Sequence, residues 1–183
     1  KGDPSKQAFE AAFTSANGQA ALHKKVSVLQ CTSAYPTPLS DANVTAMVTI
    51  REAFGLRVGF SDHTEGTIAS LAAAALGAEI IEKHFTLDRN LPGPDHKASL
   101  QPDELATLIR TIRDIEKSLG DGIKKPQPSE IETAAVARKS LVALQSINKS
   151  DILSADNIGA KRPGDGISPM QFWDFIGMPA SRH

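Results

Sequence analysis

Two histidines and a glutamate lie near the ends of short apolar segments and could support metal-assisted chemistry. His63 follows the segment 57–61, and His84, 21 residues further along, lies near the end of the segment 78–85. Neutral imidazoles are ligands for Mn, Fe, Co, Ni and Zn. Glu82 is two residues from His84, so alternation along a strand places both side chains on one face. A carboxylate there could serve as a general acid or base beside a bound metal.

The same residue types also have a purely structural interpretation. A histidine at a strand end can pack there with one ring nitrogen bonded to a backbone carbonyl. Glu82 could form an ion pair with a neighbouring Lys or Arg. A carboxylate inside a parallel sheet is costly to bury without a partner, which favours the functional interpretation for Glu82.

Hydroxyl groups and a polar loop accompany these residues. Ser33 and Tyr35 follow an apolar segment, and Ser61 ends another. Such hydroxyls can bind phosphate oxygens, or they can cap turns of the backbone. The loop 93–97, which contains Asp95, could hold a sugar or form an ordinary surface turn.

Strands and helices are predicted to alternate along the first part of the chain. Segments 26–31, 57–61 and 78–85 predict strands, and segments 42–54 and 67–76 predict the helices between them. This order is typical of βαβ units with a parallel sheet. Functional loops of such sheets follow the carboxyl ends of the strands, so the candidate residues are expected together on one rim.

Further helices are predicted from capping residues and periodicity. A helix is expected over 5–16, with Gly18 interrupting before a second short helical piece. Asp41 is expected to be the N-cap of the helix that follows it. Residues 102–119 carry one apolar stripe, with a proline in the first turn and Gly120 as the stop signal.

The composition changes after residue 120. We expect a catalytic region over 1–120, a linker over 121–137 and a smaller domain over 138–183. Within that last domain, residues 139–147 predict a strand and residues 168–175 a short helix.

Charge and cysteine content exclude several classes of protein. The 183 residues include 20 Lys and Arg and 21 Asp and Glu, for a net charge of −1. This balance argues against a nucleic-acid partner and against a polybasic membrane anchor. The single cysteine, Cys31, excludes an internal disulfide framework, favours a cytoplasmic location and is expected to be a buried, inert thiol. The longest apolar stretch, 68–76, is shorter than the roughly 20 residues that span a bilayer.

Four motifs occur in order, and together they are more specific than each alone. They are QCTSAYPTP at 30–38, GFSDHT at 59–64, IEKHFT at 81–86 and GPDHKAS at 93–99, with KRPG following at 161–164. This set closely resembles the bacterial N-acetylneuraminate (sialic acid) synthase family, which includes legionaminate and pseudaminate synthases. The likeness runs from about residue 26 to the end of the chain.

The resemblance implies a fold and a reaction. The fold is α/β: the C-terminal part of a (β/α)8 TIM barrel, followed by a small SAF (antifreeze-like, β-clip) domain. The enzyme class condenses phosphoenolpyruvate with N-acetylmannosamine or a related N-acylamino sugar and releases phosphate. A divalent metal, most often Mn²⁺, is the implied cofactor. A homodimer is implied in which the SAF domain caps the barrel of the partner subunit.

The resemblance also implies roles for the reacting groups. His63 and His84 become the metal ligands, and Glu82 becomes the acid/base group near the reacting carbons. The metal would polarise the aldehyde of the acceptor sugar as a Lewis acid. Cationic groups would stabilise the departing phosphate.

Substrate contacts are implied for five further residues. Tyr35 and Asp95 would hold the acceptor sugar. Ser61, together with Ser33, would contact the phosphate of phosphoenolpyruvate. Arg162 would reach from the SAF domain to the acyl group of the sugar. The acceptor stays open among N-acetylmannosamine, a 2,4-diacetamido-trideoxy sugar and an altrose-configured relative.

Length sets a further expectation. A (β/α)8 barrel takes about 250 residues, whereas residues 1–120 contain three predicted strands. We therefore expect a C-terminal piece of a longer synthase that is inactive by itself. The alternative is a non-catalytic sugar- or phosphate-binding α/β module with an SAF domain. Release of phosphate from phosphoenolpyruvate would distinguish the two.

Overall fold

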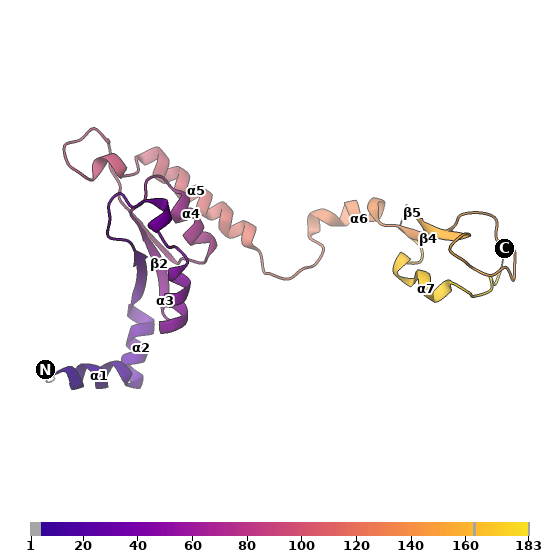
Figure 1. The fold of residues 1–183 in the computed structure, drawn as a ribbon, viewed down its shortest axis with the longest axis horizontal. Helices are drawn as coiled ribbons and strands as arrows, with labels where there is room; N and C mark the ends of the chain where they lie inside the picture. The colour runs from indigo at the N-terminus through magenta and orange to yellow at the C-terminus, as the bar shows by residue number, and fades with distance from the viewer. Residues whose placement is uncertain (1–4, 163, 183) are drawn as a thin grey trace. The chain divides into compact units, whose positions relative to one another are not determined.

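A computed structural model describes residues 5–162 and 164–182. The chain forms two compact units, Lys1–Gly122 and Ile123–His183 (Figure 1). The first unit contains a parallel sheet with helices, and the second contains a two-stranded antiparallel sheet. Pro163 of the tail motif lies outside the described residues.

The first unit is built on the predicted βαβ pattern, and the parallel sheet is confirmed. Strands β1 (Ser27–Cys31), β2 (Arg57–Asp62) and β3 (Ile80–Lys83) are hydrogen-bonded in that order. Both pairings are parallel. Helices α3 (Ala46–Phe54) and α4 (Ile68–Ala75) connect the strands and pack against the sheet (Figure 1).

Alternation along β2 separates two chemical environments. Val58 and Phe60 point toward the helices and are almost fully buried. They belong to one core cluster, which comprises Ala42, Met47, Val58, Phe60, Ala69 and Ala73. Ser61 points to the opposite face of the sheet, next to Cys31 of β1 and Glu82 of β3. The helix-covered face of the sheet is therefore mainly apolar, and the opposite face is polar where the strands end.

Helix α5 (Pro102–Leu119) has the predicted bounds. The side chains of Gln101 and Glu104 form a capping box at its start, and Gly120 follows its last residue. Leu108, from the predicted apolar stripe, is buried, and the helix packs against α4. A strong 3.6-residue period and good caps allow this helix to be predicted from local sequence.

The amino-terminal helices divide at a different residue from the one expected. Helix α1 (Lys6–Thr14) and helix α2 (Ala16–Lys25) are separated at Ser15, and Gly18 lies inside α2. Ser15 is extended, with ψ of 152°, and its hydroxyl accepts a 3.0 Å hydrogen bond from the Gly18 amide. A serine N-cap therefore starts the second helix, which overrides the weak helix-breaking tendency of glycine.

The assignment of Asp41 as an N-cap is wrong. Asp41 lies in a 3-10 turn, Leu39–Asp41, and α3 begins only at Ala46. Asn43 separates the two with φ of 44°, a left-handed conformation that a helix cannot include. Asp41 therefore lies in a turn that precedes the helix and is not its N-cap.

Strand β3 is shorter than the segment 78–85. It ends at Lys83, and Phe85 instead forms an isolated bridge with Leu100. His84 consequently lies one residue beyond the sheet. A 3-10 turn, His96–Ala98, follows within the loop that returns to Leu100.

The second unit is small and rich in turns. Strands β4 (Ser140–Ala143) and β5 (Ile158–Lys161) pair antiparallel, and β4 covers only part of the predicted strand. Its other elements are the 3-10 turn Pro128–Glu130, α6 (Ile131–Ala137), the 3-10 turn Pro169–Gln171 and α7 (Phe172–Phe175). Helix α6 thus occupies part of the segment expected to be a linker. Among the described helices of both units, none is long and apolar enough to cross a membrane.

Candidate active site at the carboxyl ends of the strands

Three rings cluster where β1, β2 and β3 end. The ring centroids of His63 and His84 are 5.4 Å apart, with the planes nearly perpendicular. Tyr35, from the loop after β1, lies 4.2 Å from the His84 ring and 5.4 Å from the His63 ring. The parallel sheet therefore brings these three predicted site residues together.

A backbone carbonyl selects the tautomer of the neutral His63 ring. Its Nδ1 lies 2.8 Å from the carbonyl oxygen of Thr32. A carbonyl can only accept, so Nδ1 carries the hydrogen, and Nε2 keeps a lone pair. Metal-binding imidazoles are usually oriented in this way, with the ring nitrogen that does not bind the metal donating to a carbonyl or carboxylate.

Cys31 differs from its prediction. It is exposed, and its side chain lies on the sheet face away from α3 and α4. Its sulfur is 3.7 Å from Nδ1 of His63. An apolar strand sequence does not show which side of a sheet is covered.

Glu82 has a hydroxyl partner on the neighbouring strand. Ser61 and Glu82 are cross-strand neighbours, and the Ser61 hydroxyl donates a 2.5 Å hydrogen bond to Glu82 Oε1. Within the described part of the chain, no Lys or Arg forms an ion pair with Glu82. The carboxylate is thereby oriented without being neutralised, as a general base requires.

Two loops are tied to the cluster by hydrogen bonds. The Thr37 amide donates to the His63 carbonyl at 2.8 Å, which holds the loop after β1 against the loop after β2. The Tyr35 hydroxyl donates to the Asp95 carbonyl at 3.0 Å, and the Ser99 hydroxyl donates to the same oxygen at 2.7 Å. Asp95 therefore joins the site through its backbone, which leaves its carboxylate available to a ligand.

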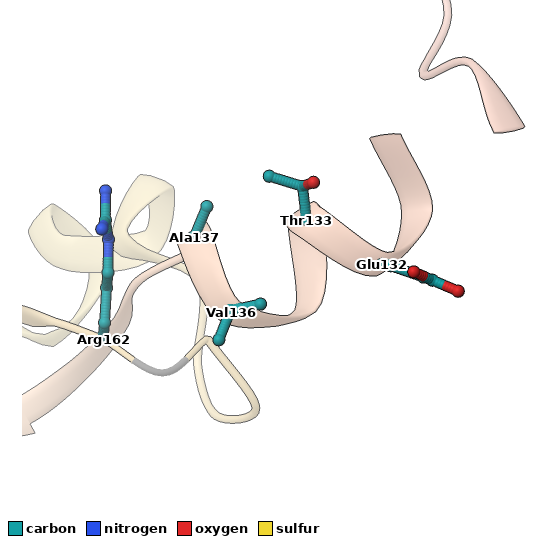
Figure 2. A pocket seen from close by; sticks show the side chains of 5 residues that line it. All are labelled: Glu132, Thr133, Val136, Ala137 and Arg162. Carbon is teal, nitrogen blue, oxygen red and sulfur yellow. The ribbon is translucent and has the colours of Figure 1, made fainter. Parts of the chain in front are cut away.

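Two other predicted substrate contacts, Ser33 and Arg162, are not part of the cluster of three rings. Ser33 is exposed in the loop after β1. Arg162 belongs to the second unit, where it borders a hollow of about 600 Å3 along α6. Figure 2 shows its guanidinium beside Ala137, with Thr133, Val136 and Glu132 further along the helix.

Residues that the sequence interpretation missed lie next to the predicted ones. The Thr32 carbonyl and the Ser99 hydroxyl both contact the ring cluster or its loops. Asp62 and Lys83 form an ion pair on the opposite face of the sheet. Both residues fall within the motifs at 59–64 and 81–86, but only the strand register shows that they pair.

The residues present fit a divalent metal as part of its ligand set. A metal–nitrogen bond is about 2 Å long, so two rings with centroids 5.4 Å apart can bind one ion. Across the described residues, no group of three or more His, Cys, Asp and Glu is arranged to hold a metal. Two imidazoles completed by oxygen ligands suit Mn²⁺ among other ions.

Comparison with known proteins defines the class of this α/β protein. Residues 3–124 match the NeuB family, so the chain belongs to that family. This match includes His63, His84 and Glu82. The resemblance to sialic acid synthases seen in the motifs is confirmed.

Several curated relatives carry related names. The chain is 50% identical over 163 residues to the N,N'-diacetyllegionaminic acid synthase of Campylobacter jejuni, covering 89% of this chain and 49% of that protein. It is 37% identical over 158 residues to the human N-acetylneuraminate-9-phosphate synthase, covering 85% and 44%. The chain spans about half the length of the curated relatives it matches.

Solved structures agree with this assignment. The spore coat polysaccharide biosynthesis protein spsE of Bacillus subtilis matches with a TM-score of 0.53 and 34% identity, covering 96% of this chain and 53% of that one. The N-acetylneuraminic acid synthetase of Leptospira borgpetersenii matches with a TM-score of 0.55 and 39% identity, covering 72% and 45%. Both solved structures are covered to about half of their length, as the curated relatives are.

Proposed function

We propose that the full-length protein containing this chain is a nonulosonic (sialic-type) acid synthase. It condenses phosphoenolpyruvate with N-acetylmannosamine or a related 2-acylamino sugar and releases phosphate. The observation that carries this proposal is the convergence of His63, His84 and Glu82 on one rim, in a chain of the NeuB family. The free thiol of Cys31 agrees with a cytoplasmic protein.

The proposal assigns the two units to parts of a larger assembly. The three-stranded sheet forms the last part of a (β/α)8 barrel, and residues 138–183 form an SAF domain. The exposed polar face of the sheet, which carries Glu82, supports this assignment because it would line the barrel interior. In a homodimer the SAF domain would cap the partner's barrel, which brings Arg162 to the sugar. Catalysis requires the whole barrel, so the isolated chain is expected to be inactive.

His63 and His84 would hold the divalent cation, with Mn²⁺ as the first choice. When bound, the cation supplies Lewis-acid polarisation of the acceptor carbonyl. His63 is prepared for this role because the Thr32 carbonyl holds its Nδ1 proton and leaves Nε2 free. Tyr35 packs beside His84 and limits the positions its ring can take.

Glu82 moves the proton in the proposed reaction. The methylene carbon of phosphoenolpyruvate attacks the sugar aldehyde, and a carbon–carbon bond forms as the aldehyde C=O opens. The former aldehyde oxygen takes up a proton from solvent and becomes a hydroxyl, and positive charge develops on the adjacent carbon of phosphoenolpyruvate. Water adds to the adjacent carbon while a Glu82 carboxylate oxygen takes its proton. The tetrahedral intermediate then expels inorganic phosphate, and the carbonyl of the 2-keto acid forms. The hydrogen bond from Ser61 supports the role of Glu82 because it fixes the carboxylate at the rim.

Substrate binding is assigned to the surrounding loops. Tyr35 and Asp95 hold the acceptor sugar, and their mutual hydrogen bond at 3.0 Å supports a shared site. Ser61 and Ser33 contact the phosphate of phosphoenolpyruvate. Both serines lie at or just beyond strand ends, where a phosphate can also meet loop amides.

Phosphate release by the full-length protein tests this function. Phosphoenolpyruvate is supplied with N-acetylmannosamine or with a 2,4-diacetamido-trideoxy sugar, before and after removal of metal with EDTA. We expect release that depends on both substrates, is lost with EDTA and returns with Mn²⁺. Sugar binding without phosphate release would instead support the non-catalytic binding module.

A further inference from the structure

Asp62 and Lys83 form a buried ion pair on the helix-covered face of the sheet. The side chains are 0% and 4% exposed, and Lys83 Nζ lies 3.1 Å from Asp62 Oδ2. Asp62 Oδ1 also accepts from the Thr64 amide and hydroxyl, both at 2.8 Å, and Oδ2 accepts from the Ser70 hydroxyl at 2.5 Å. Lys83 in turn donates to the Thr64 carbonyl. The pair is therefore desolvated and closely bonded.

The ion pair sits at the end of the pairing between β2 and β3. Asp62 and Lys83 are the last partners in that parallel register. The next residues along the two strands are His63 and His84. Each histidine therefore directly follows one member of the same cross-strand ion pair.

The network also fixes the turn beyond His63. Thr64 is bonded to Asp62 through its amide and hydroxyl and to Lys83 through its carbonyl. His63 is therefore held on both sides in the sequence. Its ring lies on the opposite side of the sheet, where it faces His84.

Stability alone gives little reason for such a pair. The free energy needed to remove two charges from water offsets much of the attraction between them. Apolar replacements of buried ion pairs are therefore often neutral or stabilising. Geometry is a stronger reason, because buried ionic groups are best documented as devices that set register. The register set here is that of the two candidate metal ligands.

We propose that Asp62 and Lys83 are positioning residues for the metal site. They hold the backbones of His63 and His84 at the separation at which both imidazoles bind one divalent cation. Neither Asp62 nor Lys83 touches the metal or the substrates. This inference rests on the proposed metal site and adds the residues that determine its geometry.

Two measurements on the full-length protein test the proposal. The EPR signal of free Mn²⁺ monitors Mn²⁺ binding, and urea unfolding gives the stability. The main variant replaces the pair by apolar residues, Asp62→Leu with Lys83→Met. We expect some loss of stability, because the Thr64 and Ser70 donors lose their acceptor, and in the folded protein Mn²⁺ binding about 10-fold weaker, a loss typical of groups outside the ligand shell. The matched control is Asp114→Leu with Lys117→Met, which removes a 2.9 Å ion pair that is 64% and 77% exposed. The control should change neither measurement.

A milder variant covers the case in which the double variant does not fold. Ser70→Ala removes one hydrogen bond to Asp62, which comes from α4. We expect a folded protein with a smaller loss of Mn²⁺ affinity in the same direction. Wild-type affinity in either folded variant overturns the proposal. A wild-type protein that binds no Mn²⁺ is a distinct result, which overturns the proposed metal site and this inference with it.

Discussion

The Ser61 hydroxyl donates its hydrogen to Glu82 Oε1 across the β2–β3 pairing, at 2.5 Å. A serine has one hydroxyl hydrogen, so Ser61 cannot donate to Glu82 and to a phosphate at the same time. Donation to the phosphate of phosphoenolpyruvate would therefore release Glu82 from this bond. The two proposed roles are linked through one proton.

Replacing the carboxylate tests Glu82 directly. Glu82→Gln keeps an acceptor for Ser61 but removes the base, so kcat should fall by about 10²–10⁴-fold, while Mn²⁺ affinity stays unchanged. Phosphate release and Mn²⁺ titration of the full-length protein give the two values. Glu79→Gln, an exposed glutamate on the same segment, is the control and should keep full activity. Equal activity in both variants would remove Glu82 from the mechanism.

The Tyr35 hydroxyl is expected to act in sugar binding. Tyr35→Phe keeps the ring beside His84 but loses the bond to the Asp95 carbonyl. A hydrogen bond of this kind contributes about 1 kcal/mol, so the KM for the sugar should rise about fivefold with little change in kcat. Steady-state kinetics with the sugar varied measure both constants. A fall in kcat at constant KM would instead place the hydroxyl in the chemical step.

Gly59 should tolerate no side chain. A Cβ at this position would lie 2.3 Å from the Ile80 carbonyl oxygen and 2.5 Å from Leu29 Cδ2. Backbone cannot move aside as a flexible side chain does, so Gly59→Ala should cost about 3 kcal/mol or more of unfolding free energy. Gly122→Ala is the comparison: nothing lies within 4 Å, and its φ of 72° alone should cost about 1–2 kcal/mol. Urea unfolding measures both losses. An equal loss of unfolding free energy in the two variants would show that β2 can move away from β1 and β3 to make room for the methyl group.

Glu104 should make the unfolding free energy fall as the pH is lowered. A hydrogen bond from the backbone N–H of Gln101, and then one from the Arg89 guanidinium, hold the pKa of the Glu104 carboxyl below its usual value of 4.5. A lowered pKa means that the ionised form favours the folded state, so this stabilisation is present above the unfolded pKa and is lost as pH falls through the folded pKa. The carboxylate is 40% exposed, so the effect should stay below about 1 kcal/mol and shrink in salt.

Unfolding free energies between pH 7 and pH 3 test this contribution. The difference between the wild-type protein and Glu104→Gln should be largest at neutral pH and should narrow below about pH 4.5. Glu116→Gln is the control. It removes a glutamate of the same helix whose ion pair with Arg113 is 64% and 51% exposed, so it should change the unfolding free energy little at any pH. A difference that grows as the pH falls would contradict the assigned sign.

Local sequence signals predicted some elements well and others poorly. The caps and apolar stripe of α5 act within a few residues, and its bounds match the prediction. The break between α1 and α2 and the start of α3 were misplaced, at Gly18 and Asp41. In both places a specific side-chain bond or turn geometry, at Ser15 and Asn43, outweighed an average preference.

The sequence by itself determined the βαβ order, the parallel sheet and the family, because periodicity and motifs are local and ordered along the chain. It also indicated that His63, Glu82 and His84 share one rim. Only the tertiary structure decided that Ser61 bonds to Glu82, that Cys31 is exposed and that Asp62 pairs with Lys83. Those contacts depend on strand register and on which face the helices cover, and both are set by packing between segments far apart in the sequence.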